Sequence, residues 1–142
     1  MNVLLDTNVL SEPMRQTPDW AVMAQLEGGG HRLHTASVVI HELRYGVQRL
    51  PKGRRRARLD SYVQGVLASG LTVLAYDTTA ALWHGEQRAS PEARGVKPPF
   101  VDGQIAAIAA TQSLVLVTRN SSDFKMFSGL EVLNWFDEPS PA

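Results

Sequence analysis

Four acidic residues stand where a negative charge is costly unless a cation compensates it. Asp6 ends the hydrophobic run 1–5, and Glu42 lies within the apolar-patterned stretch 37–43. Asp102 opens the alanine-rich segment 101–108, and Asp123 follows shortly after the hydrophobic run 114–117. Packed carboxylates repel one another and raise one another's pKa values, and a divalent metal ion is the usual compensator. Because carboxylate oxygens are hard ligands, the pattern favours Mg²⁺ or Mn²⁺.

Each acid taken alone also has an ordinary structural explanation. Asp6 can cap a helix that starts at the next residue, and Asp102 in a first helical turn would interact well with the helix dipole. Glu42 can be a solvated helix residue and Asp123 a turn residue. The four histidines are scattered and lack the spacing of a zinc site. The metal hypothesis therefore depends on the four acids taken together.

The elements that must position these acids alternate between short apolar strands and helices. Strands are predicted at 2–5, 32–35, 71–74, 114–118 and 131–134. Helices are predicted from about 18 to 28, 37–50, 54–68, 78–89 and 100–112, with a helical turn at 7–12 stopped by Pro13 and a loop at 91–99. This alternation predicts an α/β fold with a mainly parallel sheet, whose ligands bind at the carboxyl ends of the strands. Asp6 and Asp123 are expected at those ends.

Length and composition predict one globular domain. The chain has 142 residues, 44% of them hydrophobic and 20% charged, and we expect a single domain over 1–137 with a short tail at 138–142. The formal net charge is zero, so a nucleic-acid site would have to come from local patterning. The absence of cysteine excludes a disulfide scaffold and thiolate metal sites. With neither a membrane-length apolar run nor a signal peptide, the sequence predicts a cytoplasmic protein without a membrane partner.

Four blocks of the sequence together resemble the PIN-domain ribonucleases, specifically the VapC-type toxins of type II toxin–antitoxin pairs and their FitB-like relatives. The blocks are LLDTNVLSE at 4–12, ELRYGV at 42–47, DGQIAA at 102–107 and VTRN at 117–120. They occur in the family's order and span nearly the whole chain. The first block is fairly specific, the second adds weight, and the later two are weak alone. The resemblance implies a PIN-like α/β/α sandwich with a central, mainly parallel sheet flanked by helices.

The resemblance also implies an acidic site that binds Mg²⁺ or Mn²⁺ and hydrolyses RNA. Asp6, Glu42 and Asp102 match the family's first three acids. The fourth acidic position falls on Asn120, a neutral amide, which bears on a second metal more than on the first. Asp123, three residues later, is the candidate for the missing charge.

These residues receive roles in a mechanistic hypothesis. Asp6 and Asp102 anchor the metal, and Glu42 positions the attacking water or acts as a general base. The predicted metal ligands are Asp6, Glu42, Asp102 and Asp123, and Asn120 joins them as a catalytic residue. Outside this group, Thr7 and Thr118 are predicted to orient the cluster through hydrogen bonds.

Arginines supply the candidate RNA contacts. The segment 52–58 is the only dense charge run, and its arginines are Arg54, Arg55, Arg56 and Arg58. The run is interpreted as an RNA backbone contact, as a contact for an acidic surface of an antitoxin, or as a solvated helix start. Arg44 and Arg119 lie nearer the acids in sequence and are better candidates for phosphate contacts at the site.

The resemblance implies three partners: an RNA substrate, including structured RNA such as tRNA; a small VapB-like antitoxin; and a second copy of the chain in a homodimer.

Two other functions stay open. A catalytically inactive PIN-like module that binds RNA or protein is favoured only by Asn120. A flavodoxin-like phosphoacceptor switch would need an acidic pair after the first strand and an acceptor Asp ending a central strand. Here Asp6 is followed by Thr7, and the strand at 72–74 leads only to Asp77.

Overall fold

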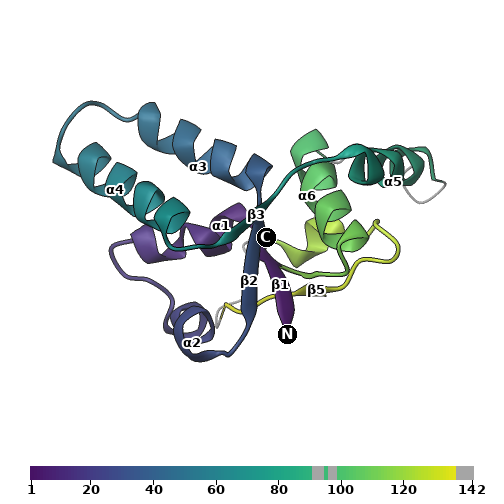
Figure 1. Cartoon of the computed structure of the whole chain (residues 1–142), viewed down its shortest axis with the longest axis horizontal. Coiled ribbons are helices and arrows are strands. Elements are labelled where there is room, and N and C mark those ends of the chain that lie inside the picture. Colours follow the sequence, from purple (N-terminus) through teal and green to yellow (C-terminus); the bar gives the residue numbers. More distant parts are fainter. Residues whose placement is uncertain (91–94, 96–98, 137–142) are drawn as a thin grey trace.

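A single parallel sheet forms the centre of the structure, a computed structural model that describes residues 1–90, 95 and 99–136. Its strands are β1 (Asn2–Leu5), β2 (Arg32–Ala36), β3 (Thr72–Leu74), β4 (Val115–Val117) and β5 (Val132–Leu133). They pair in the order β3-β2-β1-β4-β5, and every neighbouring pair is parallel (Figure 1). The predicted α/β fold with a parallel sheet is confirmed.

Helices and short 3-10 turns connect the strands. The helices are α1 (Thr7–Leu10), α2 (Trp20–Gly28), α3 (Ser37–Gln48), α4 (Arg54–Ala68), α5 (Thr78–Ala89) and α6 (Phe100–Thr111), and the 3-10 turns are η1 (Glu12–Met14) and η3 (Ser121–Phe124). Helices α4 and α5 have their predicted bounds, and the other helices begin or end within a few residues of theirs. Pro13 lies inside η1 instead of stopping a turn, because proline is compatible with the first positions of a helical segment.

Side-chain caps explain two of the helix starts. The Asp19 carboxylate accepts from the backbone N–H groups of Ala21 and Val22 at the start of α2. The Asp77 carboxylate accepts from the N–H of Ala80 at the start of α5. Each cap satisfies backbone donors that have no partner inside the helix. Asp77 therefore has a structural role, and the phosphoacceptor hypothesis loses its acceptor candidate.

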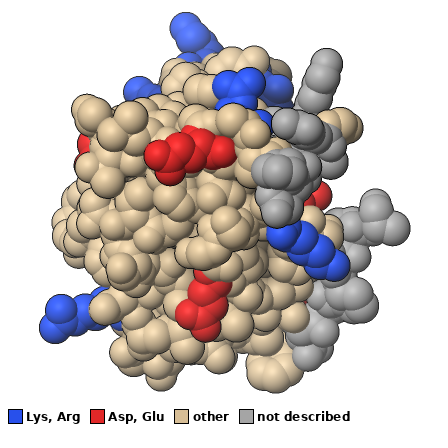
Figure 2. Space-filling view, turned by 90° about the vertical axis from the view of Figure 1, so that its right-hand side faces the viewer, with Lys and Arg blue, Asp and Glu red and all other residues tan. Residues whose placement is uncertain are grey.

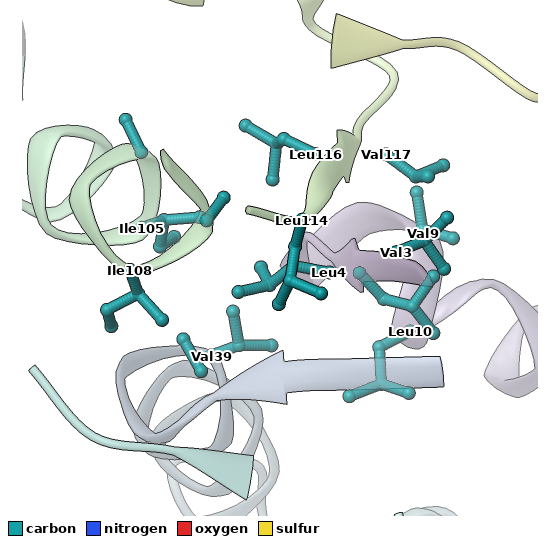
Figure 3. Packing of buried hydrophobic residues seen from close by; sticks show 14 of the residues in the cluster. Val3, Leu4, Val9, Leu10, Val39, Ile105, Ile108, Leu114, Leu116 and Val117 are labelled. Carbon is teal, nitrogen blue, oxygen red and sulfur yellow. The ribbon is translucent and has the colours of Figure 1, made fainter. Parts of the chain in front are cut away.

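The sheet is buried on both faces at its centre. Val3, Leu4 and Leu5 of β1 are fully buried, as expected for the middle strand of a parallel sheet. Figure 3 shows Leu4 and Leu116 directed toward Ile105 and Ile108 of α6. Burying side chains of this size stabilises the fold by about 1.5–3 kcal/mol each. Because α6 is fixed against the sheet in this way, its first turn is held at one end of the strands.

The helices form two groups on either side of the sheet. Helices α3 and α4 pack as a pair on one side of the view in Figure 1, and α5 packs against α6 on the other. Arg44 of α3 and Asp60 of α4 form an ion pair of 2.5 Å across the first group.

None of the described helices is long and apolar enough to cross a membrane. Most of the loop predicted at 91–99 and the whole tail predicted at 138–142 lie outside the described residues.

Candidate active site

Asp6 lies at the carboxyl end of β1 and is the N-cap of α1. Its backbone N–H donates to the carbonyl of Val117, which extends the pairing of β1 with β4 by one residue. Its carboxylate accepts two further hydrogen bonds, from the N–H of Thr7 at 2.8 Å and from the Thr118 hydroxyl at 2.7 Å. Only 7% of Asp6 is exposed. The orientation of this buried carboxylate is therefore set from both of its oxygens.

The Thr118 hydroxyl connects three segments of the chain. It donates to Asp6, and it accepts from the backbone N–H of Asn120 at 3.1 Å and from the side-chain amide of Asn8 at 3.4 Å. A hydroxyl has one donor and two acceptor lone pairs, so these three bonds use its full capacity. Thr118 is fully buried. The predicted orienting role of Thr118 thus has a geometric basis in contacts with both Asp6 and the turn after β4.

Thr7 joins Asp6 to Glu42. Its backbone N–H donates to Asp6, while its hydroxyl donates to Oε1 of Glu42 at 3.0 Å. Glu42 lies in the second turn of α3 and is half-buried. Thr7 and Glu42, which are 35 positions apart in the chain, are therefore joined by one side-chain hydrogen bond. This contact brings the second predicted acid to the end of β1.

The other two acids share the same electrostatic environment. Asp102 lies in the first turn of α6, and burial together with the negative charges of Asp6, Asp123 and Glu42 raises its pKa to about 6. Burial also raises the pKa of Asp6, with the charges of Glu42 and Asp123 acting in the same direction and hydrogen bonds from Thr118 and Thr7 opposing them. The four carboxylates are thus near enough to repel one another.

Asn120 and Asp123 contribute differently at the end of β4. Asn120 precedes η3 and offers its backbone N–H to Thr118. Asp123 is exposed within η3, and its charge acts on both Asp6 and Asp102. Within the segment that follows β4, Asp123 is consequently the residue that adds negative charge to the cluster.

The donor set has the chemistry that a hard divalent cation needs. It consists of carboxylate oxygens, and burial together with neighbouring negative charges makes the anions of Asp6 and Asp102 unfavourable without a counter-charge. In the part of the chain that the structure describes, no three His, Asp or Glu side chains already stand close enough together to hold a metal ion. Metal binding would therefore have to draw the more exposed carboxylates toward Asp6.

The acids reach this arrangement from four segments in an order that matches a known family. The family model described as PIN domain matches residues 3–129 of the chain. The chain belongs to the PIN-domain family. The acids at the ends of β1 and β4 and on α3 and α6 remain the candidate site of this PIN domain.

Several relatives support the same assignment over nearly the whole chain. VapC ribonuclease Y4jK of Sinorhizobium fredii is 31% identical over 93% of this chain and 96% of its own length. Toxin FitB of Neisseria gonorrhoeae is 32% identical over 86% of this chain and 90% of its own. Among solved structures, VapBC2 from Rickettsia felis bound to a DNA fragment from its promoter includes a chain with a TM-score of 0.80 and 27% identity, covering 95% of this chain and 99% of that one.

The predicted arginines of this PIN domain fall into two groups. Arg44 is paired with Asp60, and Arg56 donates to the carbonyl of Leu50 and the side chain of Gln48, which fastens the start of α4 to the end of α3. Arg119 donates its backbone N–H to Asn8, and its guanidinium lies 4.8 Å from the centre of the Phe136 ring. These three arginines have contacts within the fold.

The remaining arginines are exposed at the start of α4. They are Arg54, Arg55 and Arg58. Two of these, together with Arg15, line a cleft of about 960 Å³ between α4 and the chain after α1. The face of the molecule on the side of α5, shown in Figure 2, has scattered Lys and Arg side chains without a continuous basic patch. Of these two regions, the start of α4 offers the denser positive charge to a polyanion.

Two features near the acids were not predicted from the sequence. The side chain of Asn8 hydrogen-bonds both the Thr118 hydroxyl and the backbone N–H of Arg119. Its position two residues after Asp6 is the sequence feature that could have indicated a role at the site. His84 is buried against α6, where a Cβ atom added to Gly103 would meet its Nε2 at 2.0 Å. A glycine next to Asp102 is therefore needed where α5 and α6 cross. No local pattern indicates such a contact between distant residues.

Proposed function

We propose that this PIN domain is a Mg²⁺- or Mn²⁺-dependent endoribonuclease, the toxin of a toxin–antitoxin pair that a cognate antitoxin neutralises. The observation that carries the proposal is that the buried, doubly hydrogen-bonded Asp6 shares its electrostatic environment with three other carboxylates, those of Glu42, Asp102 and Asp123. The names of the relatives, a VapC ribonuclease and a FitB toxin, support the same chemistry and biological role.

In this proposal Asp6 and Asp102 hold the metal, with Glu42 and Asp123 beside them. A bound divalent ion supplies a Lewis acid for the scissile phosphate and lowers the pKa of water. Thr118 and Thr7 hold the carboxylates of Asp6 and Glu42 in place. Removing hydrogen bonds of this kind around a metal site typically lowers metal affinity or activity about 10- to 100-fold.

Glu42 is proposed as the group that takes the proton from the attacking water. Its Oε1 accepts from Thr7, while Oε2 has no hydrogen-bond donor among the described residues and is able to accept a proton. Asn120 keeps the turn after β4 in register through its bond to Thr118. Asp123 then supplies the charge that the neutral Asn120 lacks.

The substrate is proposed to be RNA, with tRNA among the candidates, and its backbone to follow the exposed arginines of α4. Arg54, Arg55 and Arg58 are available for phosphate contacts. A phosphate contact by Arg44 would have to compete with Asp60, and one by Arg119 would have to coexist with its packing on Phe136. A small VapB-like antitoxin and a second copy of the chain are the proposed protein partners.

The test is cleavage of total RNA by the purified protein, free of antitoxin, with Mg²⁺ or Mn²⁺ and with EDTA. We expect discrete products that need the metal and that disappear in Asp6→Asn and Asp102→Asn. Asp77→Asn is the matched control, because asparagine caps a helix as well as aspartate does and Asp77 caps α5. Equal cleavage by both site variants and the wild type would overturn the assignment.

A second candidate is a PIN module that binds RNA without cutting it, which the neutral Asn120 favours. RNA binding without cleavage under every metal condition would support this alternative. Restoration of cleavage by Asn120→Asp would then identify the missing charge as the cause.

A further inference from the structure

A second cleft opens directly beside Glu42 and has a volume of about 430 Å³. It lies between the first half of α3, the connection from β3 to α5, and the start of α6. The residues that line it are Ser37, Val38, His41, Glu42, Ala75, Tyr76, Val101 and Gln104. Through Glu42 the cleft is continuous with the acidic cluster. A substrate held at the cluster would therefore place its neighbouring atoms at the mouth of the cleft.

We propose that this cleft binds the RNA base next to the scissile phosphate, and that Gln104 reads the edge of that base. The proposal rests on the proposed ribonuclease function and specifies where its sequence preference originates. It concerns residues that lie outside the acidic cluster, apart from the shared Glu42.

The charge of the cleft favours a base over a phosphate. No Lys or Arg lines it among the described residues, and its one acid, Glu42, would repel a phosphate group. Val38, Ala75 and Val101 provide apolar wall, while Gln104, Ser37 and His41 provide polar atoms. Clefts that hold small organic ligands have this composition and a volume of roughly 300–1,000 Å³. A neutral, planar base is the part of a nucleotide that fits it.

Gln104 has an amide that is available for recognition. The side chain is half-buried at the cleft and has no hydrogen-bond partner within the described part of the chain. An amide offers a donor and an acceptor side by side, which complements the edge of a base. Gln104 follows Asp102 by two residues, about 200° around α6, so the two side chains serve different sides of the helix. One helical turn can thus present the acid to the cluster and the amide to the cleft.

Tyr76 provides an aromatic wall whose position is fixed. Its hydroxyl and Nδ1 of His84 are hydrogen-bonded at 2.9 Å, and only 2% of His84 is exposed. The ring also meets Phe100 edge-on, with 6.5 Å between the ring centres. Single-stranded RNA is recognised largely by stacking unpaired bases on aromatic side chains. A ring that is already held in place loses little conformational freedom when a base packs on it.

The experiment compares Gln104→Ala with Gln112→Ala. Gln112 is exposed at the other end of α6 and does not line the cleft, so it controls for removal of an amide from the same helix. Cleavage of a randomised single-stranded RNA pool with Mn²⁺ is sequenced to obtain the base preference at each position around the cut. We expect the wild type and Gln112→Ala to share a preference at one position next to the cut. Gln104→Ala should flatten that preference by about 5- to 100-fold, the size of one good base contact.

A binding assay separates the cleft from the nuclease chemistry. Fluorescein-labelled rA5, rC5 and rU5 are titrated with each protein in Ca²⁺, and the fluorescence anisotropy is followed. If the wild type cuts no RNA, the proposed function fails, but base-dependent binding that disappears only in Gln104→Ala still supports the cleft. The proposed base site is overturned if the wild type binds the three oligonucleotides with equal affinity. It is also overturned if a folded Gln104→Ala keeps the base preference of the wild type. If cleavage persists with an unchanged base preference in Gln104→Ala, the nuclease stands and the proposed role of the cleft is wrong.

Discussion

The hydroxyl of Thr118 donates a hydrogen bond of 2.7 Å to Oδ2 of Asp6, although 112 positions separate the two residues in the chain. The bond joins the ends of two adjacent parallel strands, β1 and β4. It fixes the carboxylate that lies deepest in the acidic cluster. The hydroxyl is therefore a direct link between the packing of the sheet and the chemistry proposed at its edge.

Removal of this hydroxyl should weaken both metal binding and the stability of the fold. Thr118→Val leaves Oδ2 of Asp6 without a hydrogen-bond donor, although Oδ1 keeps the bond from Thr7, and it leaves the N–H of Asn120 without an acceptor. We expect Mn²⁺ affinity and cleavage to fall about 10- to 100-fold, and the free energy of unfolding to fall by about 1–3 kcal/mol. Calorimetric titration and thermal melting measure the two effects. Thr118→Ser keeps the hydroxyl and should recover most of the metal affinity; equal losses in both variants would assign the effect to packing.

Neutralising one carboxylate should have opposite effects with and without metal. In Asp102→Asn the repulsion from Asp6, Asp123 and Glu42 is removed, so the metal-free variant should melt at a higher temperature than the wild type. The rise in melting temperature caused by Mn²⁺ should be present in the wild type and nearly absent in the variant. Asp77→Asn should keep the wild-type response. A variant that is destabilised without metal would contradict the electrostatic explanation.

The pH dependence of the wild type follows from the same carboxyl group. The pKa of Asp102 is raised from 3.8 to about 6, so the folded protein binds this proton more tightly than the unfolded chain. Ionisation of Asp102 therefore lowers stability above about pH 6, and this loss is recovered as the pH falls from about 6 toward 3.8. Since a metal competes with the proton for the carboxylate, Mn²⁺ affinity should fall as the pH is lowered through the same range. Melting curves of the wild type and Asp102→Asn across this pH range test the predicted contribution of Asp102. A difference in melting temperature between the two proteins that does not change with pH would refute this prediction.

The exposed arginines of α4 should contribute to RNA affinity through charge alone. In Arg55→Gln with Arg58→Gln, we expect weaker binding to every single-stranded RNA. The slope of log affinity against log salt concentration should fall by about 0.7 for each phosphate that the protein no longer neutralises. Arg32→Gln is the control, because Arg32 is exposed at the start of β2, opposite the carboxyl ends of the strands. A salt dependence equal to that of the wild type would identify the arginine run as solvated surface.

The crossing of α5 and α6 should tolerate no side chain at Gly103. In Gly103→Ala the new methyl group meets Nε2 of the buried His84, so we expect a loss of about 1–3 kcal/mol in the free energy of unfolding. Gly85→Ala on α5 is the matched control, because its Cβ would have open space and alanine is the better helix former. Adding His84→Ala to Gly103→Ala should recover part of the loss. Thermal unfolding of the four proteins distinguishes these outcomes, and a stable Gly103→Ala alone would disprove the close crossing.

Much of the fold could be predicted because its signals are local. The apolar strand at 2–5 and the helix at 54–68 follow from hydrophobic periodicity, and their bounds agree with the structure. The short turn at Ser121–Phe124 was missed, because its sequence carries turn residues without a helical pattern. The helical turn predicted at 7–12 was expected to stop at Pro13, but Pro13 lies inside η1. Proline can both stop and start a helical segment, so its presence alone did not decide between the two.

The candidate site was predictable in composition but not in connectivity. Asp6, Glu42 and Asp102 were found from their types, their surroundings and the family blocks. That Thr7 bonds Glu42, that Arg44 pairs with Asp60 and that His84 lies against Gly103 all depend on how distant elements pack. A single sequence carries no signal for such contacts, so they required the structure.

The position of β1 in the middle of the sheet also sets the order in which the acidic cluster can assemble during translation. Asp6 is synthesised directly after β1, but the neighbouring strand β4 comes much later, and Thr118 follows Asp6 by 112 positions. A nascent or truncated polypeptide that stops before residue 115 has three of the acids without the strand that gathers them. If the proposed chemistry holds, catalytic competence therefore arises only after β4 and Thr118 have been translated. The order of the strands keeps a partly translated chain inactive.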